Sequence, residues 1–407
     1  MGKTSSFPRR FSHLMKVRVA VVLVVGFMLP VAYLTFLASS YNGSLGSFTS
    51  NERVGVLYLR PLNGLIITLT DAESAAVQTG RVNTAAIQAA VGNVNAADAA
   101  YGSILATQQR WSDLRERITT LIANRESGQQ AFSDYSNVID LAVALVTQVG
   151  DSSNLILDPG QDSYHVVVPA MVDSVTVLVD SGQMADLVWL GSKVAPGGTA
   201  AAEGRVFAAR NGVAQAAADI DTNLQTAFEA TQSTTLAADL AAPLDQFRSA
   251  ISGFAPVTSL AELSVNLSDP RPLLAAQSQV ESAAGRLQAT MFNELDQLLR
   301  TRQDGLNSKL QRQFAAVGIA VVAAGWIGWI LLPARRAPDL AQTTDEGAAL
   351  DGGRHRAAGI GADEDPDRAD DGLTDLMDAR QLLRMDELTR VGRAVRSARR
   401  GVARDAE

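Results

Sequence analysis

Residues 19–40 read VAVVLVVGFMLPVAYLTFLASS and contain no charged side chain. An α-helix rises about 1.5 Å per residue, so this stretch can cross the roughly 30 Å hydrocarbon core of a membrane. A second uncharged stretch, FAAVGIAVVAAGWIGWILLP, fills residues 314–333 and is followed closely by Arg335 and Arg336. The sequence therefore predicts two membrane-spanning helices, at 19–40 and 313–333. The alternatives are a cleaved signal peptide for the first stretch and a buried core helix for the second.

Basic residues beside the first stretch predict its orientation. Residues 1–18 hold no acidic residue, and their basic residues are Lys3, Arg9, Arg10, Lys16 and Arg18. The positive-inside rule then places the N-terminus in the cytoplasm, and a second span returns the C-terminus there. Basic residues also precede the second stretch, but long outer domains cross the membrane largely regardless of charge. We expect a protein of the cell inner or plasma membrane with both termini cytoplasmic.

Composition excludes several kinds of function. The 407 residues include no cysteine and only three histidines, so disulfides, cysteine nucleophiles and cysteine-ligated metals are ruled out and a histidine metal site is not expected. The net charge of −8 disfavours nucleic acid as a partner. Neither a hydrolase triad nor a nucleotide-binding glycine loop can be argued from the residues. We predict no enzyme activity, no catalytic residue, no cofactor and no metal site.

The region between the two stretches is predicted to be helical throughout. Apolar residues recur at helical spacing before the second stretch, with Arg302 as an interruption; they are Val280, Ala284, Leu287, Met291, Leu295, Leu298, Leu306 and Leu310. Nothing ends this helix before the second stretch, so one rod of about 60 residues is expected. Further helices are predicted over 50–79, 84–123, 129–149, 162–190 and 201–254, the first of them continuing the first span. Residues 166–179, VVVPAMVDSVTVLV, could also pass for a strand, but the flanking pattern favours a helix.

Two motifs in this region resemble a known family. Residues 51–62 read NERVGVLYLRPL, and residues 153–164 read SNLILDPGQDSY. They resemble the outer domains of bacterial transmembrane sensors, which include methyl-accepting chemotaxis receptors, histidine kinases and diguanylate cyclases. In that family the second motif usually reads SNLxLDPDxDSYY, so Gly160 and Gln161 replace an acidic residue and its neighbour, and His165 replaces the second tyrosine. The resemblance implies a four-helix or doubled helical bundle that acts as an input domain.

Five residues are candidates for a ligand site. Asp162, Tyr164 and His165 follow the second motif, where the alternative is a well-built turn between helices. Arg53 and Arg60 belong to the first motif and could bind an anion, although helical Glu–Arg pairs more often form solvated faces.

The predicted cytoplasmic tail contains no output domain of the kind these sensors carry. Residues 373–401 form an amphipathic helix in this prediction, and its apolar side is centred on Leu383, Leu388 and Val391. That side could contact a cytoplasmic signalling protein and its arginines could contact membrane lipid, while the alternative is an unbound helix. The predicted segments are a basic N-terminus at 1–18, a span at 19–40, an outer helical bundle at 41–312, a span at 313–333, a disordered linker at 334–372 and the amphipathic helix at 373–401.

The sequence thus predicts an all-α, two-pass membrane protein, and we expect a homodimer. The preferred function is that of a receptor-like protein whose outer bundle senses a ligand or a state of the cell envelope. A short tail would pass that state to a separate partner. The alternative is a scaffold or assembly protein of the envelope, or a receptor that has lost its output domain.

Overall fold

The computed structural model describes residues 10–193, 199–254 and 270–331. The chain divides into two units, and the second, 333–407, lies outside the described residues, as do the predictions for the linker at 334–372 and the helix that carries Leu383, Leu388 and Val391. All regular structure in the described ranges is helical, which confirms the all-α prediction.

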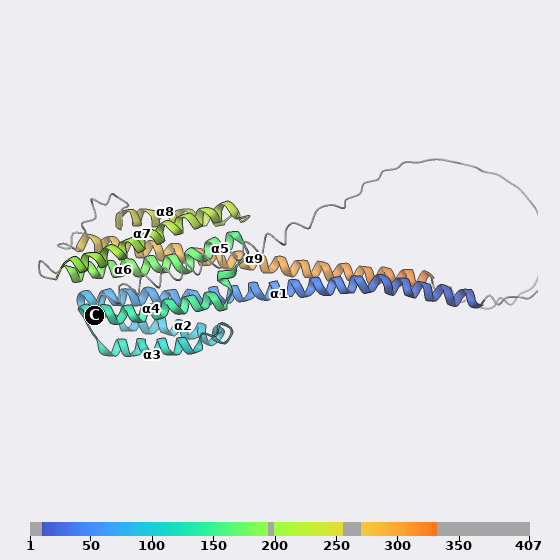
Figure 1. The fold of residues 1–407 in the computed structure, drawn as a ribbon, viewed down its shortest axis with the longest axis horizontal. Helices are drawn as coiled ribbons and strands as arrows, with labels where there is room; N and C mark the ends of the chain where they lie inside the picture. Colours follow the sequence, from blue (N-terminus) through green and yellow to red (C-terminus); the bar gives the residue numbers. More distant parts are fainter. Residues whose placement is uncertain (1–9, 194–198, 255–269, 332–407) are drawn as a thin grey trace, which may run out of the picture. The chain divides into compact units, whose positions relative to one another are not determined.

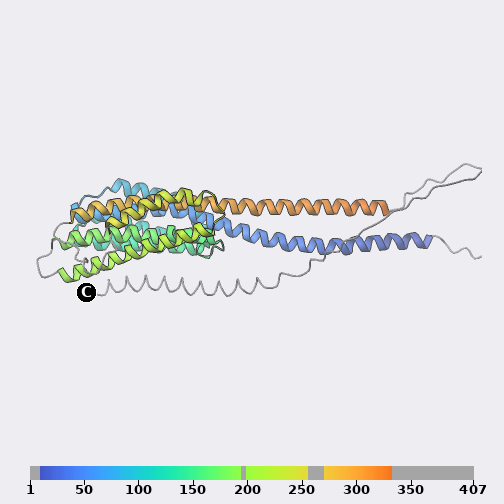
Figure 2. The ribbon, with the colours of Figure 1, turned by 90° about the horizontal axis from the view of Figure 1, so that it is seen from above.

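Two long helices run through the structure. Helix α1 spans Arg10–Thr79 and α9 spans Arg271–Leu331, with 70 and 61 residues. They pack along one another, and both continue side by side beyond the other helices (Figures 1 and 2). Each is helical without a break from the packed region into the apolar stretch named above, as the sequence pattern predicts.

A first helix group consists of α1, α2 (Thr84–Leu105), α3 (Gln108–Asn124) and α4 (Gly128–Ser152). The prediction of one helix over 84–123 is wrong, because the chain reverses at Ala106, which adopts a left-handed conformation (φ 51°). Asp98 fixes this reversal by accepting hydrogen bonds from Thr107 Oγ1 at 2.7 Å and from Tyr58 Oη at 3.0 Å. The break is therefore set by tertiary contacts rather than by a glycine or proline.

A second helix group consists of α5 (Gln161–Val168), α6 (Ser174–Gly191), α7 (Thr199–Ala230), α8 (Leu236–Phe254) and α9. A π-helical turn, Pro169–Asp173, joins α5 to α6, so residues 166–179 are helical and not a strand. The prediction of one helix over 201–254 is wrong as well. The chain breaks after α7, where the hydroxyls of Thr231 and Ser233 accept backbone N–H groups of the connecting turn.

The two groups share a seam along α1, which contacts α6 and α9 of the second group (Figure 1). The largest fully buried side chains of α1 are Tyr58, Leu59, Leu62, Leu65, Ile66 and Leu69. The predicted stripe of α9 is buried at Val280, Ala284, Leu287, Met291 and Leu295, and it becomes partly exposed from Leu298 onward. The stripe thus covers the core side of α9 only as far as the other helices reach.

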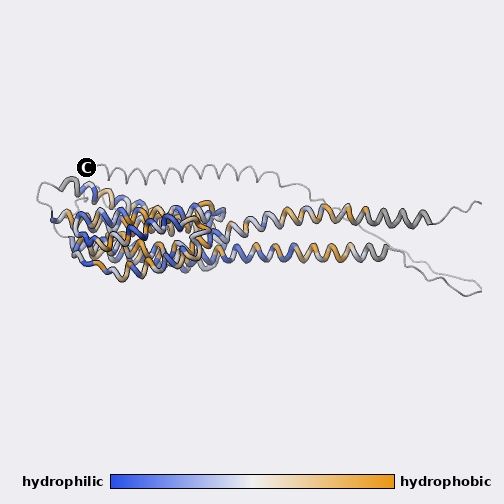
Figure 3. Tube along the Cα trace, turned by 90° about the horizontal axis from the view of Figure 1, so that it is seen from below, coloured by the Kyte–Doolittle hydropathy of each residue, from blue (hydrophilic) through white to orange (hydrophobic). Residues whose placement is uncertain are grey.

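Large apolar side chains are exposed where α1 and α9 run beyond the packed helices (Figure 3). Val22 on α1 is 68% exposed and Ile319 on α9 is 71% exposed; others are Leu29, Tyr33, Phe36, Phe314, Val322 and Trp326. Among the described side chains, a single stretch, Gln161–Gly191, is long and apolar enough to cross a membrane by length and composition. Because 72% of that stretch is buried inside the protein, it belongs to the core.

Leu287 provides a test of the core. Replacing this fully buried side chain with alanine should lower the free energy of unfolding by about 2–5 kcal/mol, because burial is lost and a cavity remains. Leu141→Ala, at a side chain that is 41% exposed, is the matched control and should cost less than about 1 kcal/mol. Denaturant unfolding followed by circular dichroism measures both. Equal costs would contradict the packing described for α9.

Candidate functional site

The two family-like motifs lie against each other. The first motif is part of α1, and the second begins the turn that follows α4. At Gly55 the turn lies so close to α1 that any side chain there would collide with the side chains of Ser153 and Leu155. Glu52 lies one turn earlier on α1 and is fully buried. The glycine thus lets α1 approach the turn closely enough for Glu52 to reach it.

Arg302 of α9 completes a charged cluster at this point. Its Nη1 lies 2.7 Å from Asp158 Oδ1 of the turn and 3.5 Å from Glu52 Oε2 of α1. Its Nη2 donates a hydrogen bond of 2.6 Å to Ser163 Oγ at the start of α5. We call Glu52, Asp158, Ser163 and Arg302 the junction cluster. Through Arg302 it connects α1, α9 and the α4–α5 turn close to where the two long helices leave the packed region.

The backbone of the turn places Asp158 beside Arg302. Asn154 adopts a left-handed conformation (φ 64°), and a single 3₁₀ turn, Leu155–Leu157, follows it. Asp158 Oδ1 accepts the Gly160 N–H at 2.8 Å, so one carboxylate both closes the turn and binds the arginine. A side chain at residue 160 would collide with the Arg302 guanidinium. A side chain here would have to displace the guanidinium or Ser163 Oγ from its position.

The junction cluster holds two buried carboxylates beside an arginine whose side chain is 26% exposed. Glu52 is fully buried and Asp158 is 2% exposed. Burial, the largest cause, and the negative charge of Asp158 together raise the pKa of Glu52 to about 8, against the opposing effect of Arg302. Among the described residues, neither carboxylate oxygen of Glu52 has a hydrogen-bond partner. At neutral pH Glu52 therefore holds a proton, and the ion pair of Asp158 with Arg302 leaves the cluster without net charge.

Glu52→Gln tests this protonation state. Because the pKa of Glu52 is raised on folding from about 4.5 to about 8, its neutral form stabilises the fold fully below pH 4.5, and this contribution is lost as the pH rises through 8. The variant cannot ionise at this position, so it does not lose this stability. The difference in free energy of unfolding between the variant and the wild type should therefore shift in the variant's favour between pH 5 and pH 8, by at most about 1.4 kcal/mol per pH unit, as measured by denaturant unfolding. A difference that does not depend on pH would show that Glu52 is ionised in the fold.

The two predicted anion-binding arginines have different surroundings. Arg53 is paired with Asp296 of α9, with Nε 2.7 Å from Oδ1, and Asp296 also binds Arg300 at 2.7 Å. Arg60 donates through Nη2 to the Phe292 carbonyl at 2.9 Å. Its Nε is buried without a hydrogen-bond partner in the described part of the chain, and so are both polar side-chain atoms of Asn63 one turn further on. Of the two arginines, Arg60 is the one with a buried donor that has no partner among the described residues.

Asp162, Tyr164 and His165 connect α5 to α7. His165 Nδ1 lies 2.9 Å from Asn223 Oδ1, and Asp162 Oδ2 accepts a 3.4 Å hydrogen bond from Thr231. The ring of Tyr164 meets that of His165 edge-on at a centroid distance of 5.3 Å. Arg53 and Arg60 instead contact α9, so these contacts do not bring the five predicted residues together in one site.

Sequence analysis did not identify the junction cluster as a site. The available signal was Arg302, an arginine that interrupts an otherwise apolar stripe. Its partner Asp158 is 144 residues away in the chain, so no local pattern indicates the pairing.

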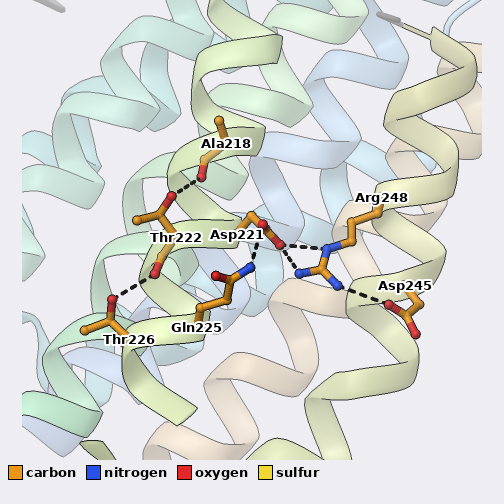
Figure 4. A network of polar contacts seen from close by, with 7 residues as sticks. All are labelled: Ala218, Asp221, Thr222, Gln225, Thr226, Asp245 and Arg248. Carbon is orange, nitrogen blue, oxygen red and sulfur yellow. Dashed lines mark hydrogen bonds and ion pairs between the residues drawn. The ribbon is translucent and has the colours of Figure 1, made fainter. Parts of the chain in front are cut away.

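Two surface features contrast with the junction cluster. Arg248 of α8 binds Asp221 of α7 and, at 3.2 Å, Asp245 (Figure 4), but its side chain is 44% exposed, and exposed ion pairs contribute little stability. An open groove of about 870 Å³ lies between α3 and α4, and charges of both signs line it. None of the five predicted ligand residues lines that groove.

No protein-family model, curated protein or solved structure matches this chain. Within the described residues, no group of three or more histidine or acidic side chains is placed to hold a metal ion. The resemblance to bacterial sensor domains therefore stays a prediction.

Proposed function

We propose that the protein is a two-pass membrane protein of the receptor type. Residues 41–312 form its outer part, a doubled helical bundle, and residues 19–40 and 313–333 cross the membrane. The exposed apolar side chains at the ends of α1 and α9 support this, because a continuous apolar surface of this kind is unfavourable in water and favourable in lipid. In the same proposal both termini are cytoplasmic, and the protein resides in the inner or plasma membrane.

The contacts between the two ends fit a paired membrane segment. Asn42 Nδ2 of α1 donates to Gln313 Oε1 of α9 at 3.2 Å, at the edge of both proposed spans. A groove of about 360 Å³ between them is lined by side chains that include Val31 and Ala38 of α1 and Ala316 and Ala320 of α9. Small residues of this kind let membrane helices approach closely.

The junction cluster supports a mechanical route for a signal. Arg302 binds the turn that precedes α5 and also contacts Glu52 of α1, and both long helices continue from there into the proposed spans. A change in the packing of the turn would shift α9 against α1 by about 1–2 Å, the scale of known helix shifts in switching proteins. A ligand acts by binding one of the two arrangements better than the other. This continuity from Arg302 into the spans is the observation that carries the proposal.

The ligand and the partners belong to the same proposal. The free donors of Arg60 and Asn63 fit an anion in the seam, while Asp162, Tyr164 and His165 offer a second, less basic position on α5. A homodimer, contact with membrane lipid and a cytoplasmic signalling partner complete the proposal, which contains no catalytic step.

Topology can be measured with reporter fusions. An alkaline phosphatase fused after Gly204, an exposed position in α7, should be active because it lies outside the cytoplasm. A fusion after Ala357 should be inactive. The reverse pattern would overturn the orientation, and activity of both fusions would overturn the second span.

Mechanical coupling can be measured by crosslinking, because the chain has no cysteine of its own. Val31→Cys and Val317→Cys place one thiol on each side of the groove between the spans. In membranes, Arg302→Gln should change the rate of disulfide formation at least severalfold, since it unpairs the buried Asp158 and frees α9 from the turn. Arg248→Gln removes the exposed ion pair of Figure 4 and should leave the rate unchanged. Equal rates in all three proteins would favour the envelope-scaffold alternative.

A further inference from the structure

Two carboxylates are buried in the seam between the helix groups. Glu73 of α1 and Asp186 of α6 are both 0% exposed, and α4 packs against both helices at this seam. They lie on the packed side of α1, well away from the junction cluster, and belong to none of the predicted site residues. Buried carboxylates normally have cationic partners, so the groups around these two decide what they do.

Neutral groups surround both carboxylates. Ser136 Oγ of α4 donates to Glu73 Oε1 at 2.6 Å. Ser74 Oγ and Gln78 Nε2 of α1 donate to the two oxygens of Asp186 at 2.9 and 3.0 Å. Among the described residues, neither carboxylate forms an ion pair, and Glu73 Oε2 has no hydrogen-bond partner.

The charges that act on this pair are also negative. Asp186 and Asp140 of α4 both raise the pKa of Glu73, which burial already places well above its usual value. Burial raises the pKa of Asp186 to about 6, against the opposing hydrogen bonds of Gln78 and Ser74. A tyrosine of α4 is affected as well: burial and the negative charge of Glu73 raise the pKa of Tyr135.

We propose that Glu73 and Asp186 form a proton-binding site that latches the two helix groups together. With protons bound, the seam is neutral, and hydroxyl and amide donors of α1 and α4 bind three of the four carboxyl oxygens. When both carboxylates ionise, two like charges face each other in a dry seam and drive α6 away from α1.

A proton fits this site better than a metal ion does. The donors at Asp186 already point hydrogen atoms at both carboxylate oxygens, so a cation would have to displace Ser74 and Gln78. The described residues also lack a third acidic or histidine ligand placed for metal binding. A proton can add to Glu73 Oε2, which has no hydrogen-bond partner among the described residues, without displacing these donors.

Close packing next to the pair limits how α1 and α6 can respond when the carboxylates ionise. At Gly182, one turn before Asp186, a side chain would collide with Thr70 of α1. The helices are therefore already at their closest approach and cannot relieve the repulsion by a small adjustment. The response that remains is for α1 and α6 to move apart at the seam.

The direction of the pH effect follows from the raised pKa values. The stabilisation from protonated Asp186 is complete below pH 3.8 and is lost as the pH rises through about 6. Glu73 loses its proton at higher pH, because its pKa is raised well above 4.5. The seam is thus closed under mildly acidic conditions and opens as the pH rises.

Distances between the helix groups test the latch in the full-length chain. Thr119→Cys on α3 and Ala242→Cys on α8 are exposed positions, and they supply unique spin-label sites because the chain has no cysteine. In lipid nanodiscs, the label distance measured by pulsed electron resonance should lengthen and broaden between pH 5 and pH 8.5. The double variant Glu73→Gln/Asp186→Asn should keep the pH 5 distance throughout, and Asp134→Asn on α4 is the control that should retain the wild-type response.

Several outcomes would overturn the latch. They are a wild-type distance that is constant with pH, a double variant that shifts as the wild type does, and a wild-type shift accompanied by loss of helical circular dichroism. If the double variant does not fold, Asp186→Asn alone should remove the part of the shift centred near pH 6. The latch does not depend on the proposed receptor function, since the label distance is read without reference to the spans or to crosslinking between them.

Discussion

The guanidinium of Arg302, held between the carboxylates of Asp158 and Glu52, is the constraint on which the rest of the arrangement depends. It is a charged side chain in the apolar stripe of α9, and burial of such a group is tolerated only when its partners are placed around it. Gly55 and Gly160 provide the room for that placement, because a side chain at either position would collide with the turn or with the guanidinium. The local backbone of two distant segments is thus dictated by one ion pair.

Acidic side chains elsewhere in the core follow a different rule. Glu73 and Asp186 are surrounded by hydroxyl and amide donors, and burial is the main cause that raises the pKa of each. Asp173 shows the same effect, with a pKa raised to about 7 by burial and by the charge of Asp219. Each of these three groups therefore binds its proton more tightly in the folded state, and the stability that it contributes is lost as the pH rises. This is opposite to a protein whose carboxylates are held in salt bridges, which loses stability as the pH falls.

Much of the fold follows from sequence patterns, and the exceptions have a common cause. The apolar spacing from Val280 to Leu295 and the uncharged run at 19–40 predict two long continuous helices, and the structure has them. The reversal at Ala106 could not be predicted, because alanine has no preference for the left-handed conformation that Asp98 holds in place. The junction cluster was missed for the same reason. Its residues are ordinary in their local context and acquire their role only when α1, α9 and the α4–α5 turn meet.

Both charged clusters act on the same helix. Glu52 and Glu73 are separated by 21 residues of α1 (73 − 52), or about 31 Å along the helix axis. Pro61 lies between them and removes one backbone hydrogen bond, so α1 bends more easily there than in the rest of the segment between Glu52 and Glu73. Opening of the seam would tilt the part of α1 that lies C-terminal to Pro61 and carries Glu73. The bend at Pro61 would absorb part of this tilt. A shift along the axis is passed on, because the chain is continuous through the bend. In the proposed latch, an axial shift of α1 rather than a tilt would therefore carry a change at the seam to the junction cluster.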